Sequence, residues 1–232
     1  LSFQDLSMIV KSFELDKIKS ETVFFLFHGG NQGHKNEIIK TKFQVKYKDS
    51  TYNYDENEIL INKENFFNNV LSKSFFENEK LIIINRITDK ILDVVEELIE
   101  KKIPDLLIIL NANVLEKRSK IRSLFEKNRD VACVAFYEDT IQTLSGIANN
   151  FFRVIKVSVS QEVINIIVQR TRGDRLNLTN ELEKIKNYIG SRKKIEREDI
   201  LRLTNLAENY NISELVDSCL SKNKKKTINI LN

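Results

Sequence analysis

The feature that most limits the fold of this chain is an alternation of short apolar runs with longer amphipathic stretches between residues 20 and 137. The runs are rich in β-branched and aromatic residues, which is typical of buried parallel strands. A more polar segment around Thr51 to Tyr54 predicts an edge strand. The alternation predicts an α/β domain with helices on both sides of a parallel sheet. The apolar runs are Val23 to Phe27, Leu81 to Ile84, Leu106 to Leu110 and Val131 to Phe136.

The segments between these runs show helical spacing. Ile38 and Phe43 lie in a Lys-rich stretch, and Phe67 and Leu71 are four residues apart. A third segment is predicted to be a helix with one apolar face, which consists of Ile91, Val94, Val95 and Leu98.

The pattern changes after Glu138, where one more apolar alternation, Val154 to Val159, precedes a helical region. From Ser160 onward the spacing predicts three short helices that form a small bundle. Gly173-Asp174 and Gly190-Ser191 separate them, because glycine ends helices and Asp or Ser caps the next one. The apolar faces are Val163, Ile166 and Ile167, then Leu178, Leu182 and Ile185, then Ile200, Leu203 and Leu206.

The sequence GGNQGHKN directly follows the first apolar run, at the place of a phosphate-binding loop. On the pattern G-x-x-x-x-G-K-[ST], Gly29 and Lys35 match, but His34 replaces the second glycine and Asn36 the hydroxyl residue. A histidine fills the phosphate cradle and an amide is a poor magnesium ligand. The loop, with Gly29, Gly30, Gly33, His34, Lys35 and Asn36, is therefore predicted to be degenerate and to bind no nucleotide.

The acidic residue that an active P-loop enzyme needs at the end of a neighbouring strand is also missing. Asn85 and Arg86 follow the run Leu81 to Ile84, and Asp89 lies too far along to fall at the strand tip. Two defects at two required positions predict that the chain does not hydrolyse ATP.

Other chemistry is sparse. His28 and His34 match no metal signature and are interpreted as polar loop histidines. Cys133 and Cys219 are interpreted as buried reduced thiols, and no metal site is predicted. The net charge of +4 is well short of a dedicated nucleic-acid binder. Without an apolar run long enough to span a membrane, we expect a cytoplasmic protein.

Two features carry candidate binding chemistry. Phe75 and Phe76 sit at a polar helix end, and since neighbours on a helix point about 100° apart, the two rings cannot share one stripe. Periodicity alone favours packing of this pair under the following strand, against exposure for a partner's pocket. Lys117, Arg118, Lys120 and Arg122 load another helix with positive charge, which is either a solvated face or a phosphate contact, with Arg118 and Arg122 as candidate DNA contacts.

Four segments together resemble the delta-subunit family of the bacterial DNA polymerase III clamp loader. This family belongs to the AAA+ superfamily, but its members do not themselves bind ATP. The four segments occur in the family's order: FFLFHGGNQGHKNEII, SFFENEKLIIIN, LLIILNANVLEKRSKIRSLFEKN and GDRLNLTNELEKIKNYIG. The resemblance runs from about Met8 to the end of the chain.

The resemblance implies an AAA+-like α/β domain of P-loop type over residues 8–139 and a helical lid over 140–207. Residues 208–232 are expected to begin a helical collar domain that is truncated here, and residues 1–7, before Met8, to be an extension.

The resemblance also implies a non-catalytic subunit without a cofactor. Such a subunit binds and opens the sliding clamp (beta subunit) for loading onto primed DNA, in a hetero-pentamer with gamma/tau and delta prime subunits of the polymerase holoenzyme. Phe75 and Phe76 match the hydrophobic pair that this family inserts into the clamp. The alternatives are an active ATPase of the AAA+ class and a general DNA-binding module.

Overall fold

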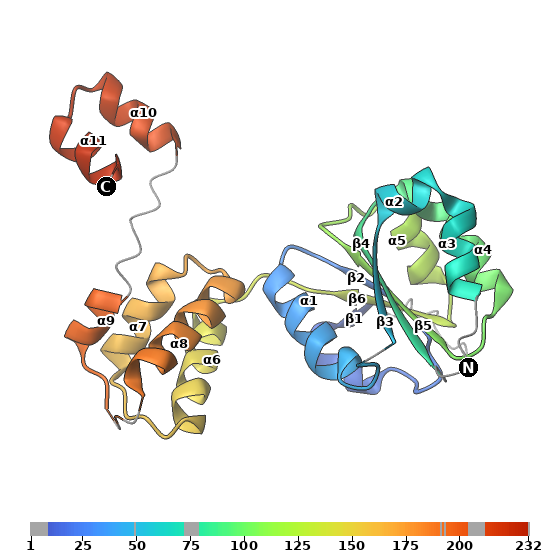
Figure 1. The fold of residues 1–232 in the computed structure, drawn as a ribbon, viewed down its shortest axis with the longest axis horizontal. Coiled ribbons are helices and arrows are strands. Elements are labelled where there is room, and N and C mark those ends of the chain that lie inside the picture. Colours follow the sequence, from blue (N-terminus) through green and yellow to red (C-terminus); the bar gives the residue numbers. More distant parts are fainter. Residues whose placement is uncertain are drawn as a thin grey trace, which may run out of the picture. The chain divides into compact units, whose positions relative to one another are not determined.

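The computed structural model describes residues 9–48, 50–71, 79–190, 192, 194–203 and 212–231. The chain divides into two compact units, Leu1–Glu138 (unit 1) and Asp139–Asn232 (unit 2). Figure 1 shows the α/β unit and the helical elements that follow it.

Unit 1 is built on a six-stranded parallel sheet with the order β1-β6-β2-β5-β4-β3. The four predicted buried strands and the predicted edge strand are all present, and β3 lies at the edge. The strand β1 was not predicted; its three residues pair with β6. The strands are β1 (Ile9–Lys11), β2 (Phe24–His28), β3 (Thr51–Asp55), β4 (Lys80–Ile87), β5 (Leu106–Ala112) and β6 (Val131–Ala135).

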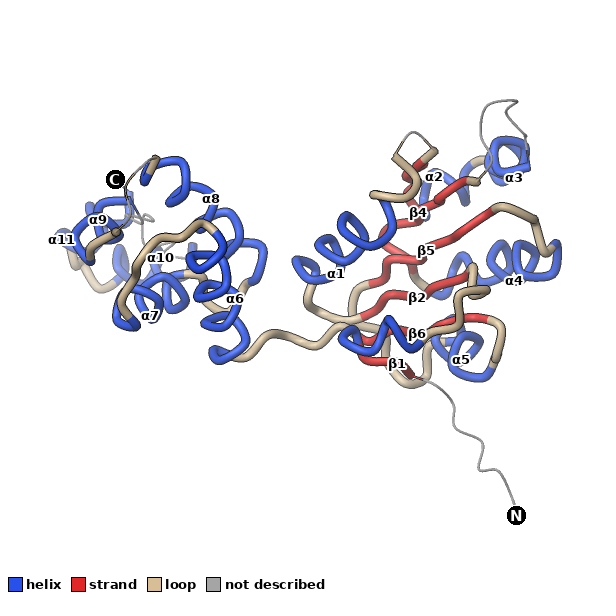
Figure 2. The backbone as a smooth tube through the Cα atoms, turned by 90° about the horizontal axis from the view of Figure 1, so that it is seen from below, coloured by secondary structure: helices blue, strands red, loops and turns tan. Residues whose placement is uncertain are grey.

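Alternate side chains of the central strands build two cores, one on each face of the sheet. Phe24 and Leu26 point to the face covered by α2 to α5, whereas Phe25 and Phe27 point to the face covered by η1 and η2. Figure 2 shows α1 on one side of the sheet and α4 and α5 on the other. The predicted two-sided α/β arrangement is confirmed. The helical elements of unit 1 are η1 (Ser12–Lys17), α1 (Gln32–Ile38), the π-helix η2 (Ile39–Gln44), α2 (Glu56–Ile61), α3 (Lys63–Leu71), η3 (Asp89–Ile91), α4 (Leu92–Lys101) and α5 (Lys120–Lys127).

The packing of η3 and α4 follows the prediction, and that of α3 follows it in part. Ile91, Val94, Val95 and Leu98 are all buried against the sheet. In α3, Phe66 and Val70 are buried and Phe67 is half-buried against the same core, while Leu71 is 46% exposed. Phe66, which was not predicted to face the core, is buried more fully than Phe67, and its ring packs edge-on against Tyr54 at 5.0 Å.

Unit 2 packs four helices around one apolar cluster: α6 (Ile141–Val154), α7 (Gln161–Arg170), α8 (Arg175–Ile189) and α9 (Arg197–Leu203). The predicted caps of α8 are present, since Asp174 accepts the N–H of Asn177 and Gly190 ends the helix with φ +56°. The helix α6 was not predicted. The apolar alternation from Val154 begins at its last residue and yields only an isolated bridge at Ser158.

Two further helices, α10 (Ile212–Leu220) and α11 (Lys224–Leu231), contact each other near the end of the chain. Cys133 is buried as predicted, but Cys219 is exposed, so the prediction of two buried thiols was wrong for the second one. Among the described residues, no helix is both long and apolar enough to cross a membrane.

Candidate phosphate-binding loop

The connection between β2 and α1 is short, and its residues form hydrogen bonds with α1 and with neighbouring segments. Only residues 29–31 separate the two elements. Asn31 caps α1: its Oδ1 accepts the N–H of His34 at 3.0 Å, and its Nδ2 donates to the carbonyl of Tyr137 at 3.0 Å. A free helix N-terminus is what binds phosphate. Here one of its N–H groups is already occupied by a side chain of the loop itself.

The two glycines at the start of the loop serve close packing. Gly29 has φ +126°, and a Cβ there would lie 2.1 Å from the carbonyl oxygen of Phe136. Its N–H donates to the carbonyl of Asn113 at 3.1 Å. A Cβ on Gly30 would lie 3.3 Å from Glu138 Oε1, so a carboxylate stands beside the loop. Negative charge at this position opposes the binding of phosphate.

Lys35 does not point toward a phosphate site. The side chain is fully buried, and its Nζ donates to the carbonyl oxygen of Ala112, at the end of β5, at 2.5 Å. Burial lowers the pKa of Lys35 to about 8, because a buried ammonium loses hydration. The one cationic residue retained from the phosphate-loop pattern is therefore used inside the domain.

The remaining loop residues are placed by α1. Gly33, His34 and Asn36 all lie within the helix, so Gly33 does not act as a loop glycine. The His34 ring packs edge-on against Phe136 at 5.3 Å. Asn36 Oδ1 accepts a hydrogen bond from Gln32 Nε2 at 3.0 Å.

The neighbouring strands carry amides near their carboxyl ends, where a magnesium site needs a carboxylate. Asn111 Nδ2 donates to Asn85 Oδ1 at 2.9 Å, linking β5 to β4. Within the described parts of the chain, no group of three or more His, Cys, Asp or Glu side chains is placed to hold a metal ion. The arrangement does not fit a magnesium–nucleotide complex, and we assign no chemistry through one.

The strand β4 runs on to Ile87, so Asp89 lies two positions beyond its end, and the prediction that it falls too far along was wrong. Asp89 has a structural role there. Its carboxylate accepts hydrogen bonds from the Ser119 hydroxyl at 2.7 Å and from the N–H groups of Ile121 at 3.0 Å and Lys120 at 3.1 Å. Burial would raise the pKa of Asp89, but these hydrogen bonds outweigh burial and lower it. The side chain thus fixes the N-terminus of α5 and is committed there.

His28 is a buried strand residue, so its interpretation as a polar loop histidine was wrong. It ends β2, is 6% exposed, and its Nε2 has no hydrogen-bond partner. Burial, followed by the positive charge of Arg122, lowers the pKa of His28 to about 4. The imidazole is neutral at physiological pH.

The two arginines proposed as DNA contacts differ in their surroundings. Arg122 is largely buried, with Nε 2.6 Å from Glu126 Oε1 and one guanidinium nitrogen donating to the carbonyl of Leu115 at 2.9 Å. Arg118 is 87% exposed and pairs with Glu116 at 2.6 Å. Only Arg118 presents its guanidinium to solvent. Phe75 and Phe76 lie outside the described residues.

No family model matches the sequence, and no curated protein sequence matches it either. Similar solved structures exist. The chain is similar to the Bacillus subtilis DNA clamp loader delta protein with a TM-score of 0.51 and 18% identity, over 94% of this chain and 68% of that one. It is also similar to the Thermotoga maritima RuvB Holliday junction branch migration motor, with a TM-score of 0.57 and 11% identity, over 91% of this chain and 73% of that one.

At these identities the likeness establishes the fold alone. The α/β unit with its six-stranded parallel sheet is an AAA+-like fold of P-loop type, as predicted. The chain thus has the class of fold that carries nucleotide-binding loops, together with a loop whose geometry does not fit a nucleotide.

Proposed function

We propose that the chain is a non-catalytic delta-type subunit of a DNA clamp loader, which binds the sliding clamp and opens it for loading onto primed DNA. The observation that carries the proposal is the placement of Lys35, whose amine is bonded to Ala112 inside the domain. In this AAA+-like fold, the lysine of the phosphate-loop pattern is used inside the domain. This placement fits a subunit that acts by binding a partner and not by hydrolysing ATP. A clamp loader delta protein is among the structures with this fold.

In this proposal residues 8–139 form the AAA+-like domain, residues 140–207 the lid and residues 208–232 the start of the collar. The other partners are the gamma/tau and delta prime subunits, and the polymerase activity belongs to the holoenzyme. Of the two arginines, the exposed Arg118 is the better candidate for contact with DNA in the assembled complex.

The proposed clamp contact is the pair Phe75-Phe76. Burial of two phenyl rings contributes about 3 to 6 kcal/mol before the costs of association. If the pair fits the opened clamp better than the closed one, binding shifts the clamp toward the open form. ATP bound by sister subunits would then decide when the pair is presented.

Binding to the sliding clamp of the same organism tests the proposal. We expect the Phe75→Ala/Phe76→Ala variant to lose at least about tenfold in affinity, which corresponds to about 1.4 kcal/mol. The matched control is Tyr137→Ala, which removes an aromatic ring that is 67% exposed and follows β6 at the carboxyl end of the sheet. Equal affinity of the double variant and the parent would contradict the assignment of the site.

A further inference from the structure

A cavity of about 500 Å³ opens on unit 1 at the amino ends of β2 and β5, the opposite end of the sheet from the loop. Pockets of roughly 300 to 1,000 Å³ with apolar floors and a few polar groups are typical binding sites. Ligands of open α/β sheets usually bind at the carboxyl ends of the strands. The cavity is therefore separate from any nucleotide position.

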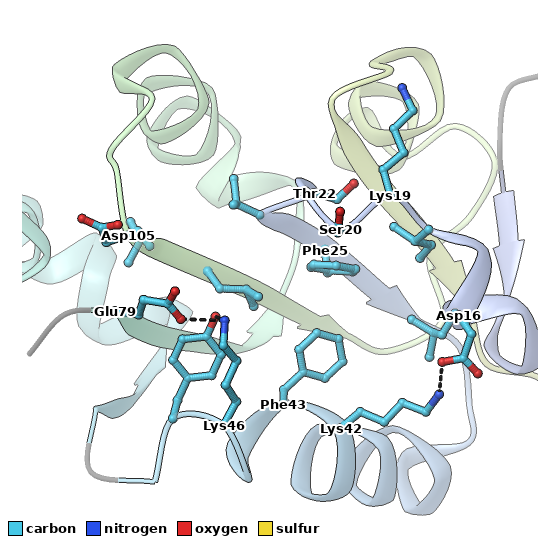
Figure 3. Close-up of a pocket in the computed structure, with 16 residues that line it drawn as sticks. Asp16, Lys19, Ser20, Thr22, Phe25, Lys42, Phe43, Lys46, Glu79 and Asp105 are labelled. Carbon is cyan, nitrogen blue, oxygen red and sulfur yellow. Dashed lines mark hydrogen bonds and ion pairs between the residues drawn. The ribbon is translucent and has the colours of Figure 1, made fainter.

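The floor of the cavity is apolar and aromatic. The rings of Phe25 and Phe43 meet edge-on, with centroids 5.2 Å apart, and Tyr47 and Leu107 also line it. Figure 3 shows the two phenyl rings in the middle of the pocket. Such a floor favours an inserted apolar or aromatic side chain.

Ion pairs stand at two sides of the cavity. Lys42 Nζ lies 2.5 Å from Asp16, and Lys46 Nζ lies 2.7 Å from Glu79. Both pairs are drawn as dashed lines in Figure 3, one on each side of Phe43. The hydrogen bond to Glu79 raises the pKa of Lys46.

Among the described residues of the lining, acids and lysines are equal in number, and this balance indicates the kind of partner. A nucleic acid requires net positive charge, which the described part of this rim lacks. A protein surface with an apolar anchor between charges of both signs matches it, because interfaces combine an apolar centre with a polar rim. The lysines are Lys19, Lys42 and Lys46, and the acids are Asp16, Glu79 and Asp105.

The cavity also lies close along the chain to the proposed clamp contact. Glu79 follows Phe76 by three positions, so at most about 11 Å of extended chain separates them. One partner can therefore reach both.

We propose that this cavity receives an apolar side chain of the protein partner that binds Phe75-Phe76, as a second anchor of the same interface. The inference rests on the proposed function, since it takes that partner to be the sliding clamp. The anchor would insert against Phe25 and Phe43, while flanking charged residues of the partner meet the two ion pairs at the rim.

Filling the cavity tests the inference. Thr22 and Ser20 line it and are labelled in Figure 3. Thr22→Trp places an indole in the cavity, and Ser20→Trp is a second filling variant. Asn113→Trp is the control, because Asn113 is exposed beyond the carboxyl end of β5. Thermal unfolding of each variant shows whether it is folded.

We expect at least one folded filling variant to bind the clamp about tenfold more weakly than the parent, and Asn113→Trp to bind as the parent does. If clamp binding depends on Phe75-Phe76 but both filling variants bind normally, the second anchor is wrong and the proposed function stands. If filling weakens clamp binding while the Phe75→Ala/Phe76→Ala variant binds normally, the cavity is supported and the assigned pair is wrong.

Two further outcomes would overturn the inference. If the parent chain does not bind the clamp, the proposed function and the second anchor both fail. If filling the cavity weakens binding of a labelled single-stranded oligonucleotide and leaves clamp binding unchanged, the assignment to a protein partner is wrong.

Discussion

The two ends of the parallel sheet in unit 1 use their polar side chains in different ways. At the carboxyl end, polar side chains form hydrogen bonds within the domain: Lys35 with Ala112, Asn31 with His34, and Asn111 with Asn85. At the amino end, charged side chains form solvent-accessible ion pairs around a cavity. Polar side chains at the usual ligand site of such a sheet are thus hydrogen-bonded within the domain, while those at the opposite end line a cavity. The fold class alone therefore does not show that the usual ligand site binds a ligand.

The comparison implies that substitutions at the carboxyl end cost more folding free energy than those at the amino end. The largest effect is expected for Gly29→Ala, which places a methyl group against the Phe136 carbonyl in a backbone conformation with positive φ. We expect a loss of about 3 to 5 kcal/mol in the free energy of unfolding, measured by urea denaturation.

Gly30→Ala is the matched control, since its methyl group would meet only the end of the flexible Glu138 side chain. Its cost should stay below about 1 kcal/mol. Equal costs for the two substitutions would show that the loop is not held against Phe136 as described.

The buried His28 should make the domain sensitive to acid. The folded-state pKa of His28 is lowered to about 4, so the unfolded chain takes up the proton first as the pH falls. Stability is therefore lost between about pH 6.5 and pH 4, by up to about 3 kcal/mol. Comparison of the parent with His28→Gln across this window isolates the effect, and parallel pH profiles would contradict it.

Lys35 should make the free energy of unfolding depend on pH in the alkaline range, about as strongly as His28 does in the acidic range. Burial lowers its pKa from 10.5 to about 8, so between these values the unfolded chain binds more protons than the folded one. The parent should gain about 2 to 3 kcal/mol relative to Lys35→Met as the pH rises from about 8 to 10.5. An unchanged difference between the two proteins over this range would mean that the lysine is exposed to water.

The smallest effect is expected at the amino end. Lys42→Ala and Lys46→Ala each remove one solvent-accessible ion pair, which is worth less than about 1 kcal/mol. Urea denaturation of these two variants beside the Gly29 variant measures the contrast directly. A loss of several kcal/mol from either lysine would show that the amino end is as tightly coupled to folding as the carboxyl end.

Much of the fold could be predicted because the central strands are continuous apolar runs. The strand β1 escaped prediction because three residues carry too little periodicity, and its pairing with β6 joins Ile9 to Cys133 across more than half of the chain. The orientation of α3 was missed for a related reason. Phe66 and Phe67 are both aromatic and both pack on the core, and the fuller burial of Phe66 goes with its contact to Tyr54 on β3, which local spacing does not show.

At the candidate loop, the sequence shows which residues of the phosphate-loop pattern are missing. It does not show the contacts that Lys35 and Asp89 make within the domain. The substitutions at His34 and Asn36 are visible in the motif. The bond from Lys35 to Ala112 spans 77 positions, and the carboxylate of Asp89 caps a helix that begins about thirty residues later. Such contacts depend on how strands are ordered in the sheet, and no local pattern encodes them.

The central claim is that the carboxyl end of the sheet does not bind a nucleotide. Titration of the chain with a labelled ATP analogue and magnesium tests it most directly, with Lys35→Met in parallel. The account predicts no saturable binding by either protein up to millimolar ligand. Saturable binding by the parent that is lost in Lys35→Met would contradict it.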